Sequence, residues 1–226
     1  MSTINIAIDG PAGAGKSTIA KMVSAQLGYI YVDTGALYRA VALYITENNI
    51  ADDDIVDSLK NADVKLKFIG GKQCVLLGER DVSELIRTPE ISMSASKVST
   101  ISKVRDYLFD MQKKIARENN VIMDGRDIGT VVLPHADVKI YLTATAQERA
   151  KRRHKELSEK SECCPCYEEI LNDIIERDKN DMNRKTAPLK QADDAVLVDS
   201  TALTLEESAA EIISIIHEKL NGSVEN

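Results

Sequence analysis

The sequence predicts an α/β fold in three layers, with a mainly five-stranded parallel sheet between helices. Short apolar runs rich in β-branched residues occur at 4–8, 29–32, 121–123, 138–142 and 195–199, and amphipathic helical segments follow most of them. This alternation is typical of parallel strands joined by right-handed crossovers. The chain has 226 residues, 43% of them hydrophobic, which is enough for one globular unit with a buried core.

The net charge of the chain limits the kinds of partner that the protein can bind. The chain has 29 basic and 36 acidic residues and a net charge of −7, which argues against a general binder of nucleic acid or of membrane surfaces. The N-terminal apolar run is short for a signal peptide and lacks a basic lead, and no segment has the length of a membrane span. We therefore expect a cytoplasmic protein, with a monomer as the default state.

The four cysteines predict no disulfide framework. Cys163, Cys164 and Cys166 form a Cys-Cys-Pro-Cys cluster, and Cys74 stands alone. A structural zinc site at this cluster would need two more ligands, for which His154 and Glu162 are candidates by proximity only. Reduced thiols in a solvated turn are the favoured interpretation, and metal binding or redox sensitivity stays open.

The first strand leads into a glycine-rich loop that matches the pattern G-x-x-x-x-G-K-[ST]. A helix with Ile19, Val23 and Leu27 on one face follows it, so the motif has the strand–loop–helix context of a phosphate-binding P-loop. Glycines let backbone N–H groups surround a polyphosphate, and the helix N-terminus adds partial positive charge. We expect Lys16 to reach the β- and γ-phosphates of a bound nucleotide and Ser17 to ligate Mg²⁺. The predicted nucleotide-binding residues are Gly10, Pro11, Ala12, Gly13, Ala14, Gly15, Lys16, Ser17 and Thr18.

The chain continues with a second strand and helix and then departs from the alternation of strands and helices. Gly28 ends the first helix, and Asp33-Thr34-Gly35 caps the second after strand 29–32. Residues 51–90 instead predict a short helix through Leu59 and a small antiparallel insert. Its strands run through 64–68 and 75–77 around a Gly70-Gly71 turn, and Asp81-Val82-Ser83 could add a third.

The second half returns to the α/β pattern and adds a pair of polar helices. Pro89 opens a helix to about Thr100, and a longer helix extends to about Glu118. Strands 121–123 and 138–142 follow. Helices over 146–159 and 167 to about 183, joined by the cysteine turn, suit a mobile lid. A last strand and an amphipathic helix close the chain.

Polar motifs follow three of the predicted parallel strands. They are residues 10–18, Asp33-Thr34-Gly35 and Asp124-Gly125-Arg126-Asp127. Ligands bind beyond the carboxyl ends of such strands, so we expect the three motifs to share one crevice. Asp124 has the position of an acid that orients Mg²⁺, directly or through water. The alternative role for Asp124 is to cap a turn at the strand end.

The sequence resembles the bacterial cytidylate kinases, which belong to the nucleoside-monophosphate kinase family of P-loop proteins. The resemblance covers about 4–220 and rests on several stretches. They are Ile8-Asp9-Gly10-Pro11 with the rest of the glycine loop, Asp33 to Arg39, Asp124 to Thr130, and Glu176-Arg177-Asp178 through Asn183-Arg184. It implies transfer of a phosphoryl group from MgATP to CMP or dCMP. It also implies a single kinase domain with core 1–35, 106–150 and 190–226, a monophosphate-binding region 36–105 that holds the antiparallel insert, and a lid at about 151–189.

The resemblance further implies which residues line the acceptor site and lid. Arg39, Arg126 and Arg177 would clamp the acceptor phosphate, which the planar guanidinium fork suits. A carboxylate such as Asp127 can accept from the N4 amino group of cytosine, whereas uracil presents an oxygen there. Ser96 and Arg105 would help read the base, and Asp181 and Arg184 would contact the sugar. The implied substrate residues are Thr34, Arg39, Ser96, Arg105, Arg126, Asp127, Arg177, Asp181 and Arg184, and the implied catalytic residues are Lys16, Arg126, Arg177 and Arg184.

Phosphoryl transfer to such an acceptor needs no general base, because a phosphate monoester is already largely ionised at neutral pH. Catalysis would consist of positioning and charge neutralisation, with lid closure excluding water. The lid departs from many relatives at Asn180 and Met182, where those carry further arginines, so its catalytic contribution stays open. The alternatives are a kinase of UMP, AMP, dTMP or a small alcohol, and a nucleotide-switched NTPase.

Overall fold

The computed structural model describes residues 3–70, 72–160 and 164–222 and contains the predicted parallel sheet. Its five strands lie in the order β2-β6-β1-β7-β8, and every neighbouring pair is parallel. The strands are β1 (Asn5–Asp9), β2 (Ile30–Asp33), β6 (Val121–Gly125), β7 (Val138–Thr143) and β8 (Val196–Asp199). The prediction of a mainly five-stranded parallel sheet is therefore confirmed.

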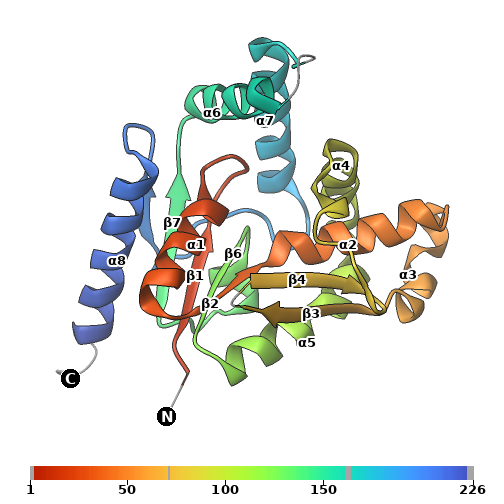
Figure 1. Ribbon diagram of the computed structural model, residues 1–226, viewed down its shortest axis with the longest axis horizontal. Helices are drawn as coiled ribbons and strands as arrows, with labels where there is room; N and C mark the ends of the chain where they lie inside the picture. The colour runs from red at the N-terminus through yellow and green to blue at the C-terminus, as the bar shows by residue number, and fades with distance from the viewer. Residues whose placement is uncertain (1–2, 71, 161–163, 223–226) are drawn as a thin grey trace.

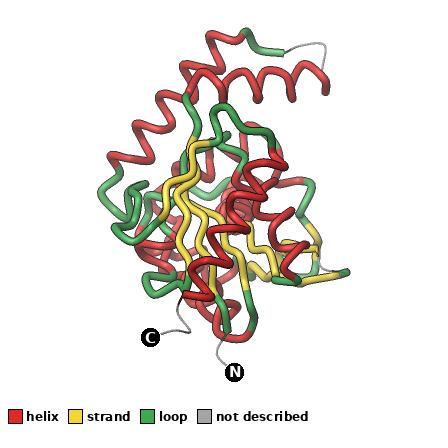
Figure 2. The backbone as a smooth tube through the Cα atoms, turned by 90° about the vertical axis from the view of Figure 1, so that its left-hand side faces the viewer, coloured by secondary structure: helices red, strands yellow, loops and turns green. Residues whose placement is uncertain are grey.

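Helices cover both faces of this sheet (Figure 2). Because side chains alternate along β1, Ile6 and Ile8 pack with α1 (Lys16–Leu27) and α8 (Leu205–Gly222), whereas Ala7 belongs to the core on the other face. That second core includes residues of α5 (Ser102–Glu118) and of a π-helical turn, η4 (Ile128–Val132). The three layers place the carboxyl ends of all five strands at one edge.

The segment between β2 and α5 forms a second unit with its own hydrophobic core beside the sheet (Figure 1). The predicted antiparallel hairpin is present, and Leu66 lies opposite Val75 in its register. The third strand is only Arg80–Asp81, one residue earlier than predicted, because Val82 turns inward to the core and is fully buried. Its elements are α2 (Thr34–Glu47), η1 (Asp52–Asp54), α3 (Ile55–Ser58), η2 (Leu59–Asn61), β3 (Val64–Ile69), β4 (Lys72–Leu77), β5 (Arg80–Asp81), η3 (Leu85–Arg87) and α4 (Pro89–Val98).

The side chain of Gln73 bonds this unit to the backbone at the edge of the main sheet. The amide of Gln73, on β4, accepts from the backbone N–H of Asp33 at 2.8 Å and donates to the Asp33 carbonyl at 3.2 Å. Asp33 ends β2, the outermost strand on this side of the sheet. Gln73 therefore makes the pair of hydrogen bonds that a neighbouring strand would make.

Two polar helices, α6 (Ala146–Lys160) and α7 (Tyr167–Asn183), stand above the carboxyl ends of the strands (Figure 1). They pack on each other through a small apolar cluster of Ala150, Ile170 and Ile174. The prediction of two polar helices here is confirmed. Glu162 and Cys163 lie outside the described residues, and within the described part of the chain no group of three or more His, Cys, Asp or Glu side chains could hold a metal ion.

No helix in the described ranges is long and apolar enough to cross a membrane.

Candidate functional site

The three polar motifs meet at the carboxyl edge of the sheet. In the parallel register, Asp9 is the partner of Gly125 and Asp33 the partner of Asp124, so the strand ends lie side by side. The Thr34 hydroxyl donates to the Asp124 carbonyl at 2.8 Å and ties two of the motifs together. The strand order thus brings residues from distant parts of the chain to one place.

The glycine loop adopts a backbone that needs its glycines. Gly10 has a φ of 151°, and a Cβ there would lie 1.9 Å from the Leu142 carbonyl oxygen of β7. Gly15, also with positive φ, precedes the first turn of α1. The Lys16 ammonium is buried and donates to the Pro11 carbonyl at 2.6 Å. Burial, and then the nearby Arg126, lower the pKa of Lys16 to about 7. An anion bound in the loop would stabilise the protonated form of Lys16 and raise its pKa again.

Partly buried Ser17 and buried Asp124 form an oxygen pair at the start of α1. The Ser17 hydroxyl donates to Asp124 Oδ2 at 2.6 Å, and the Tyr31 hydroxyl donates to Oδ1 at 3.1 Å. Burial raises the pKa of Asp124, and the neighbouring Asp33 adds to this effect. Hydroxyl and carboxylate oxygens are ligands that Mg²⁺ accepts. The two predicted metal residues therefore fit that ion, and Tyr31, which sequence reasoning missed, orients Asp124.

Asp9 is a second buried carboxylate that sequence reasoning missed. It ends β1, and its two oxygens accept from the backbone N–H groups of Ile128 at 2.8 Å and Gly129 at 2.7 Å. Burial raises the pKa of Asp9 to about 6. The contact fixes the start of the π-helical turn η4 and hence the loop that carries Arg126 and Asp127.

Three of the predicted arginines gather opposite the glycine loop. Arg39 pairs with Asp33 at 2.8 Å, and Arg126 pairs with Asp181 of α7 at 2.9 Å. Burial lowers the pKa of Arg177, and repulsion from Arg126 and Arg39 contributes. The Nε–H groups of Arg39 and Arg177 are buried and have no hydrogen-bond partner within the described residues. Buried donors on mutually repelling cations provide a site for a multiply charged anion.

Asp127 joins two more of the predicted residues. Its carboxylate pairs with Arg105 of α5 and, at 3.3 Å, with Arg184 just after α7. Burial raises the pKa of Asp127, and the two guanidinium groups oppose that effect. Ser96 lies half-buried on α4, and within the described residues no hydrogen bond joins its side chain to Arg105, Asp127 or Arg184. The geometry thus brings Arg105, Asp127 and Arg184 together but leaves Ser96 apart.

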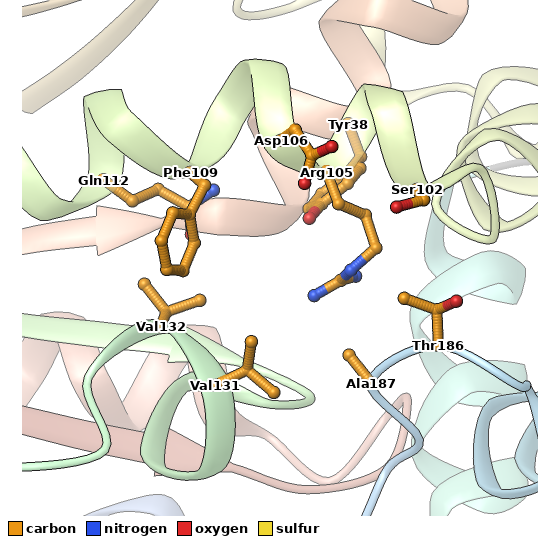
Figure 3. Close-up of a pocket in the computed structure, with 10 residues that line it drawn as sticks. All are labelled: Tyr38, Ser102, Arg105, Asp106, Phe109, Gln112, Val131, Val132, Thr186 and Ala187. Atoms are coloured by element: carbon orange, nitrogen blue, oxygen red, sulfur yellow. The ribbon is translucent and has the colours of Figure 1, made fainter.

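A pocket of about 230 Å³ adjoins Arg105 (Figure 3). The guanidinium of Arg105 extends into it toward Thr186 and Ala187, and the Arg105 side chain also lies over the ring of Tyr38, 5.7 Å from the ring centroid. One wall is apolar, with Phe109 of α5 facing Val132 of η4. Other lining residues are Ser102, Asp106, Gln112 and Val131.

A larger cleft of about 520 Å³ separates α6 from α2 and α4. Its basic residues include the predicted Arg39 and also Arg87 and Arg153, which were not predicted as site residues. Arg87, on η3, lies 3.4 Å from Asp33. Arg153 lies on α6 and lines the other side of the cleft. The cleft is lined by Lys21, Arg39, Glu84, Arg87, Pro89, Ser92, Arg153, Glu156 and Leu157.

The family model and the curated relatives agree on one family. The family model described as "Cytidylate kinase" matches residues 6–218. A cytidylate kinase of Caldicellulosiruptor bescii is 52% identical over 99% of this chain and 100% of its own length. One from Fusobacterium nucleatum is 48% identical, covering 97% of this chain and 98% of its own. Among solved structures, a gluconokinase from Sinorhizobium meliloti aligns with a TM-score of 0.53 at 14% identity, over 99% of this chain and 97% of that one. That likeness concerns the fold alone.

Proposed function

The chain belongs to the cytidylate kinase family, and from this membership we propose how its residues divide the work of the family's reaction. The protein transfers the γ-phosphoryl group of ATP to CMP or dCMP, giving ADP and CDP or dCDP. We assign ATP to the glycine loop, residues 10–18, and the acceptor nucleotide to the space between that loop, α2 and α7.

The unpaired Nε–H groups of Arg39 and Arg177 carry the assignment of the acceptor phosphate. A buried N–H without a partner is costly, and a phosphate oxygen supplies the strongest acceptor for it. With Arg126 beside them, these groups form a clamp for a dianionic monophosphate. A small alcohol would offer no charged oxygens to the buried Nε–H groups of Arg39 and Arg177, so we propose a phosphorylated acceptor.

Asp127 is the proposed reader of the base. Arg105 and Arg184 hold its two oxygens from opposite sides, which supports a fixed, ionised carboxylate. Such a group accepts from the N4 amino group of cytosine and repels the O4 atom of uracil. Asp181 and Arg184 at the end of α7 are proposed to contact the sugar, and Thr34 to line the same site.

Lys16, Ser17 and Asp124 are proposed to serve the donor phosphates. Lys16 would neutralise charge on the β- and γ-phosphates, while Ser17 would ligate Mg²⁺ and Asp124 would orient it, held by Tyr31. When bound, Mg²⁺ supplies charge stabilisation for the phosphates. The chain's own contribution is positioning, neutralisation by Lys16, Arg126, Arg177 and Arg184, and exclusion of water when α6 and α7 close over the cleft.

We retain the division into core, monophosphate-binding region 36–105 and lid at about 151–189 as a proposal. Separate apolar clusters within 36–108 and within the α6–α7 pair support it. Small nucleotides are the proposed partners, with a monomer working in the cytoplasm.

The test is ADP release from MgATP with a panel of acceptors: CMP, dCMP, UMP, AMP, dTMP and none. Turnover confined to CMP and dCMP is expected. Lys16→Ala should abolish it, while Lys60→Ala, on the surface of η2, should leave it unchanged. Hydrolysis without an acceptor, and without stimulation by any monophosphate, would instead indicate a nucleotide-switched NTPase.

A further inference from the structure

Arg149, at the start of α6, is the most completely bonded arginine in the described part of the two polar helices α6 and α7. Its Nε donates to the Ala144 carbonyl at 2.9 Å, and Nη1 donates to the Ala12 carbonyl at 2.9 Å. Nη1 and Nη2 also donate to the two carboxylate oxygens of Asp178, at 3.1 and 2.6 Å. The side chain is only 5% exposed. Four of its five N–H donors are thus committed to three separate segments.

These three segments have different places in the proposed reaction. Ala12 lies in the glycine loop, which holds the donor phosphates. Asp178 lies on α7 and follows Arg177, whose guanidinium is proposed to clamp the acceptor phosphate. Ala144 lies between β7 and α6, where the lid leaves the sheet. Arg149 therefore connects the donor loop, the helix of the acceptor clamp and the base of the lid.

The glycine loop is shaped to receive this side chain. A Cβ at Gly13 would lie 3.4 Å from the Cβ of Arg149, so the loop backbone and α6 are in close contact at this point. The Ala12 carbonyl points toward the guanidinium, since it accepts from Nη1. The guanidinium thus fixes the orientation of the peptide that joins Ala12 to Gly13.

We propose that Arg149, together with Asp178, is a positioning residue that aligns the donor and acceptor phosphates. The inference rests on the proposed function, since it takes the glycine loop as the donor site and Arg177 as part of the acceptor clamp. In-line transfer requires the reacting atoms to approach within about 3–3.5 Å, and a misplacement of about 1 Å can cost on the order of 100-fold in rate. A rigid fork that bonds both sites limits that misplacement. Neither Arg149 nor Asp178 is required to touch a nucleotide.

The experiment compares steady-state kinetics of Arg149→Lys, Asp178→Asn and the double variant in the full chain. Lysine keeps the charge but has no planar fork, so it cannot hold the Ala12 carbonyl and both oxygens of Asp178 at once. Asparagine keeps the shape of Asp178 but accepts through one oxygen only. We expect each single variant to lower kcat at least tenfold at saturating ATP and CMP, with the KM for CMP within threefold of the parent. The double variant should fall little below the worse single one, because both changes break the same connection.

Arg80→Lys is the matched control, since Arg80 pairs with Glu47 on the surface of the insert. It should keep the parent kcat. Assays run at least 20 °C below the Tm of each variant, measured by circular dichroism, so that only folded protein is compared. Single variants with kcat within twofold of the parent, or a loss of kcat that follows the folded fraction, would overturn the inference. A parent without CMP-dependent turnover would overturn the proposed function instead, so the two failures are distinguishable. If Arg149→Lys does not fold, Asp178→Asn alone decides between these outcomes.

Discussion

At the scale of single residues, Asp9 imposes a pH dependence on the fold. Its buried carboxylate has a pKa raised from 3.8 to about 6, so it stays protonated in the folded protein where the unfolded chain has already lost the proton. The folded state therefore binds this proton more tightly. The contribution of Asp9 to the free energy of unfolding is fully present below pH 4 and is lost as the pH rises through about 6. The free energy of unfolding falls by ~3 kcal/mol over this range.

The comparison is urea unfolding of the parent and Asp9→Asn between pH 3.5 and 8. Asparagine cannot ionise, so the free energy of unfolding of the variant relative to the parent should rise between pH 4 and 6 and stay level above that. The lost acceptor for the N–H groups of Ile128 and Gly129 adds a constant offset. A difference that does not change with pH would show that Asp9 ionises with an ordinary pKa.

Asp127 determines base preference if its proposed role is correct. Asparagine at this position has an amide N–H that can face the O4 atom of uracil, so Asp127→Asn should lower the ratio of kcat/KM for CMP to that for UMP by at least tenfold, or ~1.4 kcal/mol. The ratio is measured with both acceptors under identical MgATP. Asp110→Asn, on the exposed side of α5, is the control and should leave it unchanged. An unchanged ratio in Asp127→Asn would remove this residue from base reading.

At the scale of elements, the junction of β1 with the glycine loop depends on close contact with β7. The Cβ of an alanine at Gly10 would clash with the backbone of Leu142, and backbone cannot move aside as a flexible side chain can. Gly10→Ala should therefore lower the free energy of unfolding by at least ~2 kcal/mol and weaken ATP binding. Gly70→Ala, where φ is 57° and the surroundings are open, should cost only about 1 kcal/mol. Urea unfolding and calorimetric ATP titration test the pair, and equal losses would contradict the steric explanation.

The elements themselves were largely predictable, because their patterns are local. The buried strands and the insert hairpin follow from apolar runs and alternation, and the helix caps follow from Asp33 and Gly28. The π-helical turn η4 was not predicted. Its first N–H groups bond to Asp9, more than a hundred residues away in the chain, so its geometry depends on tertiary contact.

At the scale of the whole molecule, the exposed large hydrophobic side chains are distributed over different elements, such as Ile69 at the end of β3 in the small sheet and Leu197 in β8 of the large sheet. Separated side chains of this kind do not form a contiguous interface. We expect a monomer of 24.9 kDa in size-exclusion chromatography with light scattering, at concentrations up to 100 µM. A mass near twice that value would contradict this expectation.

The assembled site could be predicted only in part. The resemblance of motifs indicated Arg126, Asp127, Arg177 and the glycine loop, and the strand order brings these motifs to one edge. Arg149 could not be identified, because the helix around it has the composition of a solvated surface helix. Only the packing of α6 on the glycine loop shows that one of its cations is buried. Ser96 illustrates the opposite case, since resemblance assigns it a role and the described contacts leave it apart.

The amide of Gln73 has a consequence for how the protein behaves in a crowded solution. The outer strand of an open sheet offers unpaired peptide groups that can recruit a strand from another molecule, which begins aggregation. Gln73 occupies the peptide groups of Asp33 at the end of β2 with a side chain instead of a strand. A side chain cannot extend the sheet further. The insert therefore opposes growth of the sheet at the end of β2, in addition to any part it has in holding a nucleotide.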